Sequence, residues 1–175
     1  MPRSILVAYA TRNGSTGEVA EAIGKQIRDA GLSADVVRMK GGPALEGRSD
    51  VILGAPLYMG SLPGEFHRFL HRNRLSLCFL RAWVFVLGPV HAEPKEVAEA
   101  RKQAERQLAK YGWLNLAELQ IFGGRFDVNH MGFPFSLARH LPMFPAKNMP
   151  PTDARDWDAI RGWAAAIAGQ KRTAA

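Results

Sequence analysis

The fold is decided by one stretch near the start of the chain, Ile5-Leu6-Val7-Ala8-Tyr9-Ala10-Thr11-Arg12-Asn13-Gly14-Ser15-Thr16-Gly17-Glu18-Val19-Ala20. Its apolar beginning predicts a buried strand, a hydroxyl-rich loop with a glycine follows, and an amphipathic helix begins after the loop. A loop that leads from a strand into a helix N-terminus is a frequent phosphate site, because the first backbone N–H groups of the helix point at the anion. The stretch therefore predicts a phosphate-bearing cofactor held by loop 11–16.

Two common phosphate loops are absent from this stretch. No Lys precedes the hydroxyl residues, as the nucleoside-triphosphate motif requires, and only Gly14 and Gly17 are available for a dinucleotide motif with three glycines. The remaining donors are side-chain hydroxyls and backbone N–H groups, which suit a terminal monoester phosphate. The alternative is an ordinary turn in which Ser15 or Thr16 caps the helix.

The composition indicates one α/β domain with enough apolar residues for a core. We expect this domain to span residues 1–170 and residues 171–175 to form a disordered tail. The sequence contains no run of about eighteen apolar residues, so we expect no membrane helix. We also expect no signal peptide before the first strand. The only cysteine, Cys78, excludes an internal disulfide, fits a cytoplasmic location and is expected to be a small buried side chain.

The chain carries 23 Lys and Arg residues against 16 Asp and Glu residues, a formal net charge of +7. Such a surface favours anionic partners, which include a carboxylated substrate, an anionic membrane surface and nucleic acid. No known nucleic-acid-binding motif is present, so we expect no nucleic acid partner. No His, Cys, Asp or Glu cluster has metal-ligand spacing, so we expect no metal. No nucleophile–base pair is visible, so any catalysis would depend on the cofactor.

Strand-like and helix-like segments alternate along the chain, which predicts a parallel sheet with helices on both faces. The expected strands span residues 4–9, 34–39, 51–55, 83–87 and 116–122. The expected helices span residues 17–30, 63–74, 95–111 and 153–168, with Gly31 ending the first and Asp153 as candidate cap of the last. The helix at 63–74 has a basic face, which suits either an amphipathic surface helix or a contact with lipid headgroups.

The loop residues Thr11, Arg12, Asn13, Gly14, Ser15 and Thr16 resemble the FMN phosphate loop of the flavodoxin-like family, commonly written Ser/Thr-x-Ser/Thr/Asn-Gly-x-Ser/Thr. The resemblance covers most of the chain and extends to the branch that contains menaquinone-dependent protoporphyrinogen oxidases, whose loop also tends to carry an arginine at the Arg12 position. It implies a three-layer fold with strand order 2-1-3-4-5 and a ligand beyond the carboxyl ends of the strands. It also implies that this loop holds the FMN phosphate, with Arg12 either joining the contact or lying in solvent.

A second loop follows the expected strand at 51–55, and a third loop follows the expected strand at 83–87. Both would meet the first loop at the same edge of the sheet. The resemblance implies that the second loop flanks the flavin ring, with Tyr58 either stacked on the flavin or packed as an ordinary surface aromatic. It implies that the third loop approaches the pyrimidine edge of the ring, with His91 either contacting flavin or substrate or lying in solvent. The candidate residues of these two loops are Pro56, Leu57, Tyr58, Met59, Gly60, Gly88, Pro89, Val90 and His91.

Residues 125–151 lack a clear period and mix cations with Phe, Met, Pro and His. A comparable segment is associated with activity on the porphyrinogen in the protoporphyrinogen oxidase branch. The resemblance therefore implies a substrate role for Arg125, His130 and Arg139. Cations among aromatics suit a flat molecule with carboxylates, or a membrane surface. The alternative is a proline-rich flap packed on the edge of the sheet.

These observations and the resemblance predict an FMN-binding oxidoreductase. It would oxidise protoporphyrinogen IX or a similar reduced substrate and pass the electrons through FMN to a quinone. One alternative is a flavodoxin that carries electrons between protein partners, although such carriers are usually acidic and this chain is basic. The other is a flavin-free binding module, which the intact loop hydroxyls oppose. A homodimer and a peripheral contact with the inner face of the membrane are further expectations.

Overall fold

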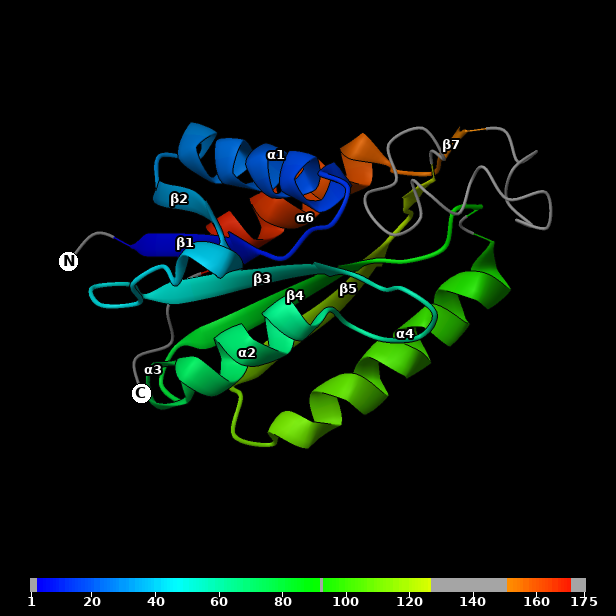
Figure 1. Ribbon diagram of the computed structural model, residues 1–175. Helices are drawn as coiled ribbons and strands as arrows, with labels where there is room; N and C mark the ends of the chain where they lie inside the picture. Colours follow the sequence, from blue (N-terminus) through cyan, green and yellow to red (C-terminus); the bar gives the residue numbers. More distant parts are fainter. Residues whose placement is uncertain (1–2, 92, 127–150, 171–175) are drawn as a thin grey trace.

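The computed structural model describes residues 3–91, 93–126 and 151–170, and its centre is a five-stranded parallel sheet (Figure 1). The strands are β1 (Ser4–Tyr9), β2 (Ser33–Arg38), β3 (Asp50–Pro56), β4 (Arg81–Leu87) and β5 (Leu116–Phe122). Their order across the sheet is β2-β1-β3-β4-β5, so the fold class implied by the resemblance is confirmed. The central strand β3 is buried along its whole length, as expected of a parallel strand covered on both faces.

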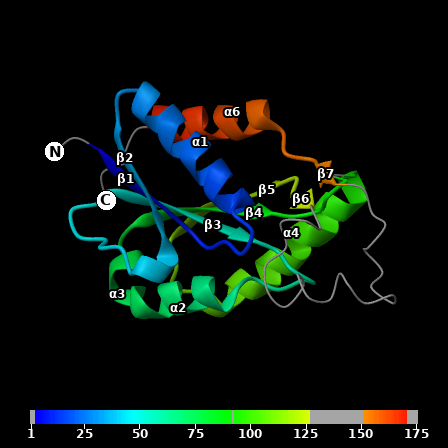
Figure 2. The same cartoon turned by 45° about the horizontal axis from the view of Figure 1, so that its top comes forward.

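Helices cover both faces of the sheet and complete three layers (Figure 1, Figure 2). One face carries α1 (Ser15–Asp29) and α6 (Trp157–Gly169), and the other carries α2 (Gly64–Arg72), α3 (Arg74–Leu77) and α4 (Pro94–Leu108). Two 3-10 turns, η1 (Met39–Gly41) and η2 (Ala109–Tyr111), follow β2 and α4. Within the described ranges, no helix is long and apolar enough to cross a membrane.

Alternate side chains of β1 supply the two cores of the molecule. Ile5 and Val7 pack in the cluster that contains α1 and α6 residues. Leu6 and Ala8 pack in the cluster that contains α2 and α4 residues, because successive side chains of a strand point to opposite faces. Burial of each large aliphatic side chain contributes about 1.5–3 kcal/mol, so this one strand joins both helical layers to the sheet.

Several predicted details of the elements hold, and others need correction. Gly31 follows α1 with a φ of 83°, as a C-terminal glycine should. The helix expected at 63–74 is interrupted at Asn73, whose Nδ2 donates to the Phe69 carbonyl (2.9 Å), and α3 follows as a separate helix. The helix expected at 95–111 ends at Leu108 and tightens into η2. Cys78 is only half-buried, which corrects the expectation of a buried side chain.

Asp153 does not cap the last helix, contrary to the prediction. It lies in β7 (Thr152–Asp153), which pairs antiparallel with β6 (Arg125–Phe126) in a separate two-stranded sheet. The cap is Asp156, whose Oδ1 accepts hydrogen bonds from the backbone N–H groups of residues 158 and 159 at 3.0 and 2.9 Å. Because these bonds satisfy two otherwise unpaired donors, α6 begins after Asp156.

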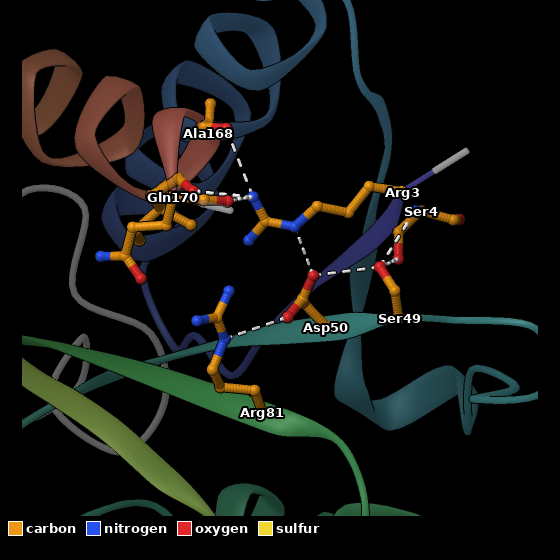
Figure 3. Close-up of polar contacts among 8 residues, drawn as sticks. Arg3, Ser4, Ser49, Asp50, Arg81, Ala168 and Gln170 are labelled. Atoms are coloured by element: carbon orange, nitrogen blue, oxygen red, sulfur yellow. Dashed lines mark hydrogen bonds and ion pairs between the residues drawn. The ribbon is translucent and has the colours of Figure 1, made fainter. Parts of the chain in front are cut away.

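A buried ionic cluster ties the strands together at their amino ends, on the side opposite to the predicted loops (Figure 3). Asp50 is 1% exposed, and its carboxylate accepts from Arg3 Nε (2.6 Å), Ser49 Oγ (3.0 Å) and Arg81 Nε (3.3 Å). Arg3 Nη1 also donates to the carbonyls of residues 167, 168 and 170 at the end of α6. Removal of one partner from such a buried pair costs about 3–5 kcal/mol, so the cluster anchors this end of the sheet.

Candidate functional site

The three predicted loops leave the carboxyl ends of β1, β3 and β4, which are neighbours in the sheet (Figure 1). Backbone hydrogen bonds extend the sheet into the loops, from Ala10 N–H to the Gly54 carbonyl and from Leu57 N–H to the Leu87 carbonyl, each at 2.8 Å. The structure therefore brings the loops to the edge where open parallel α/β sheets bind their ligands.

The first loop enters α1 through Gly14, whose φ of 88° lies in the left-handed region that favours glycine. The Thr11 hydroxyl accepts the Gly14 N–H at 2.9 Å and fixes this turn. No side chain caps the helix, so the alternative with Ser15 or Thr16 as the cap is wrong. The first helical hydrogen bond runs from Glu18 N–H to the Gly14 carbonyl (3.2 Å). The N–H groups of residues 15–17 therefore have no acceptor within the helix.

Thr16 adds a buried hydroxyl to these open donors. Its side chain is fully buried, and its Oγ1 has no hydrogen-bond partner in the described part of the chain. An unpaired buried hydroxyl costs about 1–3 kcal/mol, so a native structure normally pairs such a group with a ligand or water. The hydroxyl and the three N–H groups lie at the positive end of the α1 dipole. This donor set fits the oxygens of a phosphate monoester.

Glu18, in the first turn of α1, is bound by two arginines from the chain after β5. Its Oε2 accepts from Arg155 Nη1 at 2.6 Å, and its Oε1 accepts from Arg125 Nη1 at 3.5 Å. The Arg155 side chain is 3% exposed, pairs with Asp153 at 2.6 Å and lies over the Trp157 ring at 4.7 Å. The two arginines offset a carboxylate that would otherwise weaken anion binding at this helix N-terminus.

Of the three predicted substrate residues, the structure describes one. Arg125 lies in β6 and pairs with Glu18, so the structure places it beside the first turn of α1. His130 and Arg139 lie outside the described residues. Across the part of the chain that the structure describes, no three His, Cys, Asp or Glu side chains are grouped to hold a metal ion.

The second loop closes into a tight hairpin over residues 58–61. Tyr58 N–H donates to the Ser61 carbonyl at 3.0 Å, and Ser61 N–H donates to the Tyr58 carbonyl at 2.9 Å. The two residues between them have positive φ, 47° at Met59 and 78° at Gly60, which is the pattern of a primed hairpin turn. Glycine adopts this conformation readily, whereas Met59 is a non-glycine residue in an uncommon one. The Met59 side chain is fully exposed.

Tyr58 is half-buried and contacts the first loop through Arg12. The Arg12 guanidinium carbon lies 5.2 Å from the centroid of the Tyr58 ring, within the range of a cation–π interaction. Burial raises the pKa of the Tyr58 phenol, and the Arg12 charge offsets part of this rise. Tyr58 is therefore held between the first two loops as a neutral ring, and its stacking on a flavin stays a prediction.

A pocket of about 650 Å³ opens between the second loop, the third loop and α4. The predicted residues that line it are Leu57, Met59, Gly60, Gly88, Pro89 and Val90. Pro56 is buried at the end of β3, and His91 is exposed and does not belong to this lining. The structure thus combines the second and third loops in one concave surface.

The charge of this pocket was not predicted from the sequence. Glu93, Glu96 and Glu99 line it together with Lys95, so a chain of net charge +7 carries a local negative surface here. Glu96 and Glu99 lie three residues apart on α4 and therefore on the same side of the helix, and Glu93 is the residue just before it. This spacing is the sequence signal that reveals the acidic stripe.

Comparison with known proteins agrees with this geometry. A family model described as a flavodoxin domain matches residues 6–135, which include all three loops. The chain belongs to the flavodoxin domain family. This flavodoxin domain is 23% identical over 111 residues to the protoporphyrinogen IX dehydrogenase (quinone) of Escherichia coli K12. The match covers 62% of the chain and 61% of that relative, so the chain spans about three fifths of the length of this curated relative.

Solved flavodoxins share the fold of this flavodoxin domain. Oxidised flavodoxin 1 from Bacillus cereus superposes with a TM-score of 0.52 at 22% identity, over 79% of this chain and 99% of that protein. Two-electron reduced Megasphaera elsdenii flavodoxin gives a TM-score of 0.54 at 15% identity, over 95% and 99% of the two chains. A flavodoxin fold implies a flavin, typically FMN, and the donors of the first loop fit its phosphate.

Proposed function

We propose that this flavodoxin domain binds FMN and acts as an oxidoreductase. The observation that carries the proposal is the donor set at the start of α1, where the N–H groups of residues 15–17 and the buried Thr16 hydroxyl lack acceptors among the residues that the structure describes. These groups would hold the FMN phosphate, with the half-buried Ser15 hydroxyl beside them. Arg12 and Asn13 are the exposed residues of the same loop.

The flavin ring would lie along the second and third loops. Bound FMN would supply the redox chemistry, in which two electrons and a proton are taken from a reduced substrate and later given to an acceptor. The part of the protein is to bind and orient the ring and to keep water from it. Leu57, Pro89 and Val90 offer apolar surface for this purpose, and Tyr58 offers an aromatic face.

The proposed substrate is a porphyrinogen, with a quinone as the electron acceptor. The support is the 23% identity to a protoporphyrinogen IX dehydrogenase that uses a quinone. The net charge of +7 suits a substrate with carboxylates. The pocket beside α4 suits a neutral quinone better than a carboxylated molecule, because three glutamates line it. A porphyrinogen would therefore approach from the side of Arg12 and Arg125.

The second candidate function is that of an electron carrier between proteins. One observation favours it. The exposed Met59 lies beside the glutamates at 93, 96 and 99, so an apolar tip with an acidic surround is present although the whole chain is basic. Such a surface would suit a basic redox partner. A homodimer likewise stays a proposal, and nothing found supports contact with a membrane.

An anaerobic assay separates these functions. The FMN-loaded protein is mixed with protoporphyrinogen IX, and then with a soluble menaquinone analogue, while the flavin absorbance is followed. We expect the substrate to bleach the flavin bands and the quinone to restore them. Because FMN takes two electrons at a time and the porphyrinogen must lose six, protoporphyrin should appear only after three such turnovers, with three equivalents of quinone reduced to quinol. No bleaching by the porphyrinogen, together with rapid reduction by a flavodoxin reductase, would contradict the enzyme and favour the carrier.

A further inference from the structure

The Arg12–Tyr58 contact joins the two loops that would surround the cofactor. Arg12 follows Thr11 in the phosphate loop, and Tyr58 begins the hairpin after β3. The guanidinium lies over the ring at 5.2 Å. Within the described ranges no carboxylate forms an ion pair with Arg12. Its charge is therefore directed to the aromatic face and not neutralised by an acidic side chain.

The hairpin makes Tyr58 a well-defined partner for this cation. Two backbone hydrogen bonds tie Tyr58 to Ser61, and Met59 and Gly60 complete the turn with positive φ. The hairpin thus fixes the backbone of Tyr58, and Arg12 needs to restrict only the side-chain torsions of the ring. Because the phenol is neutral, the attraction to Arg12 comes from the ring face and not from an ion pair.

We propose that Arg12 is a positioning residue that acts on the flavin through Tyr58, holding the ring as one wall of the site and keeping a positive charge next to it. The proposal rests on the proposed binding of FMN. Reduction of a flavin by two electrons and one proton leaves one negative charge on its ring system. A cation fixed on Tyr58 stabilises this anion relative to the neutral oxidised flavin. Arg12 therefore raises the flavin midpoint potential, which suits a flavin that takes electrons from a substrate.

Arg12→Gln tests this role, with Arg106→Gln as the matched control. The control removes the same charge from an exposed position in the last turn of α4, which is not part of the pocket lining. We expect Arg12→Gln to weaken the binding of reduced flavin about three- to tenfold more than that of oxidised flavin. This ratio corresponds to a fall of about 15–30 mV in the midpoint potential of the two-electron couple. Arg106→Gln should leave the potential unchanged.

Riboflavin, which lacks the phosphate, shows whether Arg12 acts through the phosphate or through Tyr58. We expect Arg12→Gln to weaken the binding of FMN and the binding of riboflavin by the same factor. In a Tyr58→Leu background the Arg12→Gln effect should disappear, whereas in a Tyr58→Phe background it should persist because the ring remains. Dissociation constants from flavin fluorescence and potentials from equilibration with a reference dye supply these values.

Three results would overturn the proposal while FMN binding itself stands. The first is a loss of affinity in Arg12→Gln that is confined to FMN, which would mean that Arg12 contacts the phosphate. The second is tighter flavin binding by Arg12→Gln, which would mean that Arg12 competes with the flavin for Tyr58. The third is an unchanged flavin midpoint potential in Arg12→Gln. If the unaltered protein binds neither FMN nor riboflavin, the proposed function fails and the proposal fails with it.

Discussion

At the scale of single residues, Thr16 is the most informative side chain of the molecule. A threonine at a fully buried position with an unpaired hydroxyl lowers stability, since a valine of the same shape would fill the space without burying a polar group. Its cost is explained if the hydroxyl serves a ligand. The sequence predicted Thr16 as a phosphate contact from its place in the loop. It could not show that the side chain would be buried beneath the helix start.

Thr16→Val tests separately what the buried hydroxyl costs in stability and what it contributes to FMN binding. Without cofactor, we expect the variant to be as stable as the parent protein or more stable by about 1 kcal/mol, because a desolvated hydroxyl is removed. Its affinity for FMN should fall about tenfold or more, because a hydrogen bond to a charged phosphate is lost. Urea unfolding without flavin and a fluorescence titration with FMN measure the two effects. A large loss of stability with unchanged affinity would mean that the hydroxyl serves only the fold.

At the scale of elements, the short sheet of β6 and β7 fixes the chain against the start of α1. Arg125 in β6 and Arg155 just after β7 both bind Glu18, and Asp153 completes the network. The resemblance implied a substrate role for Arg125, which stays a prediction, and local pattern suggested that Asp153 caps the last helix, which is wrong. Neither source contains the pairing of Glu18 with Arg125 and Arg155, because these residues lie more than a hundred positions from Glu18 in the sequence.

Asp153 makes this network sensitive to acid. Hydrogen bonds from Arg155 lower the pKa of the Asp153 carboxyl, so its contribution to stability is complete above the unfolded pKa of about 3.9. That contribution is lost as the pH falls through the lower folded pKa. We expect Asp153→Asn to lower the free energy of unfolding by about 0.5–1 kcal/mol at pH 7, the range of a partly exposed ion pair.

The difference in the free energy of unfolding between Asp153→Asn and the parent protein should then shrink as the pH falls below about 3.9. Urea unfolding of both proteins at several pH values between 3 and 7 gives this comparison. A difference that stays constant down to pH 3 would show that the carboxylate charge is not what stabilises the network.

At the scale of the whole molecule, the two ends of the sheet have different tasks. The amino ends are joined by the buried Asp50 cluster, and the carboxyl ends carry the loops of the candidate site (Figure 1, Figure 3). The alternation of strands and helices predicted the layers, and the resemblance implied the strand order. The net charge of +7 could not reveal the acidic stripe beside the pocket, because a sum of charges over the whole chain does not say where each charge lies.

The central claim is that the loops at the carboxyl ends of β1, β3 and β4 form an FMN site. Titration of the flavin-free protein with FMN, followed by flavin fluorescence and visible absorption, tests it most directly. We expect saturation at one FMN per chain and a clear preference for FMN over riboflavin, because the donors of residues 15–17 and Thr16 serve the phosphate. Absence of saturable binding, with the protein folded by circular dichroism, would contradict the account.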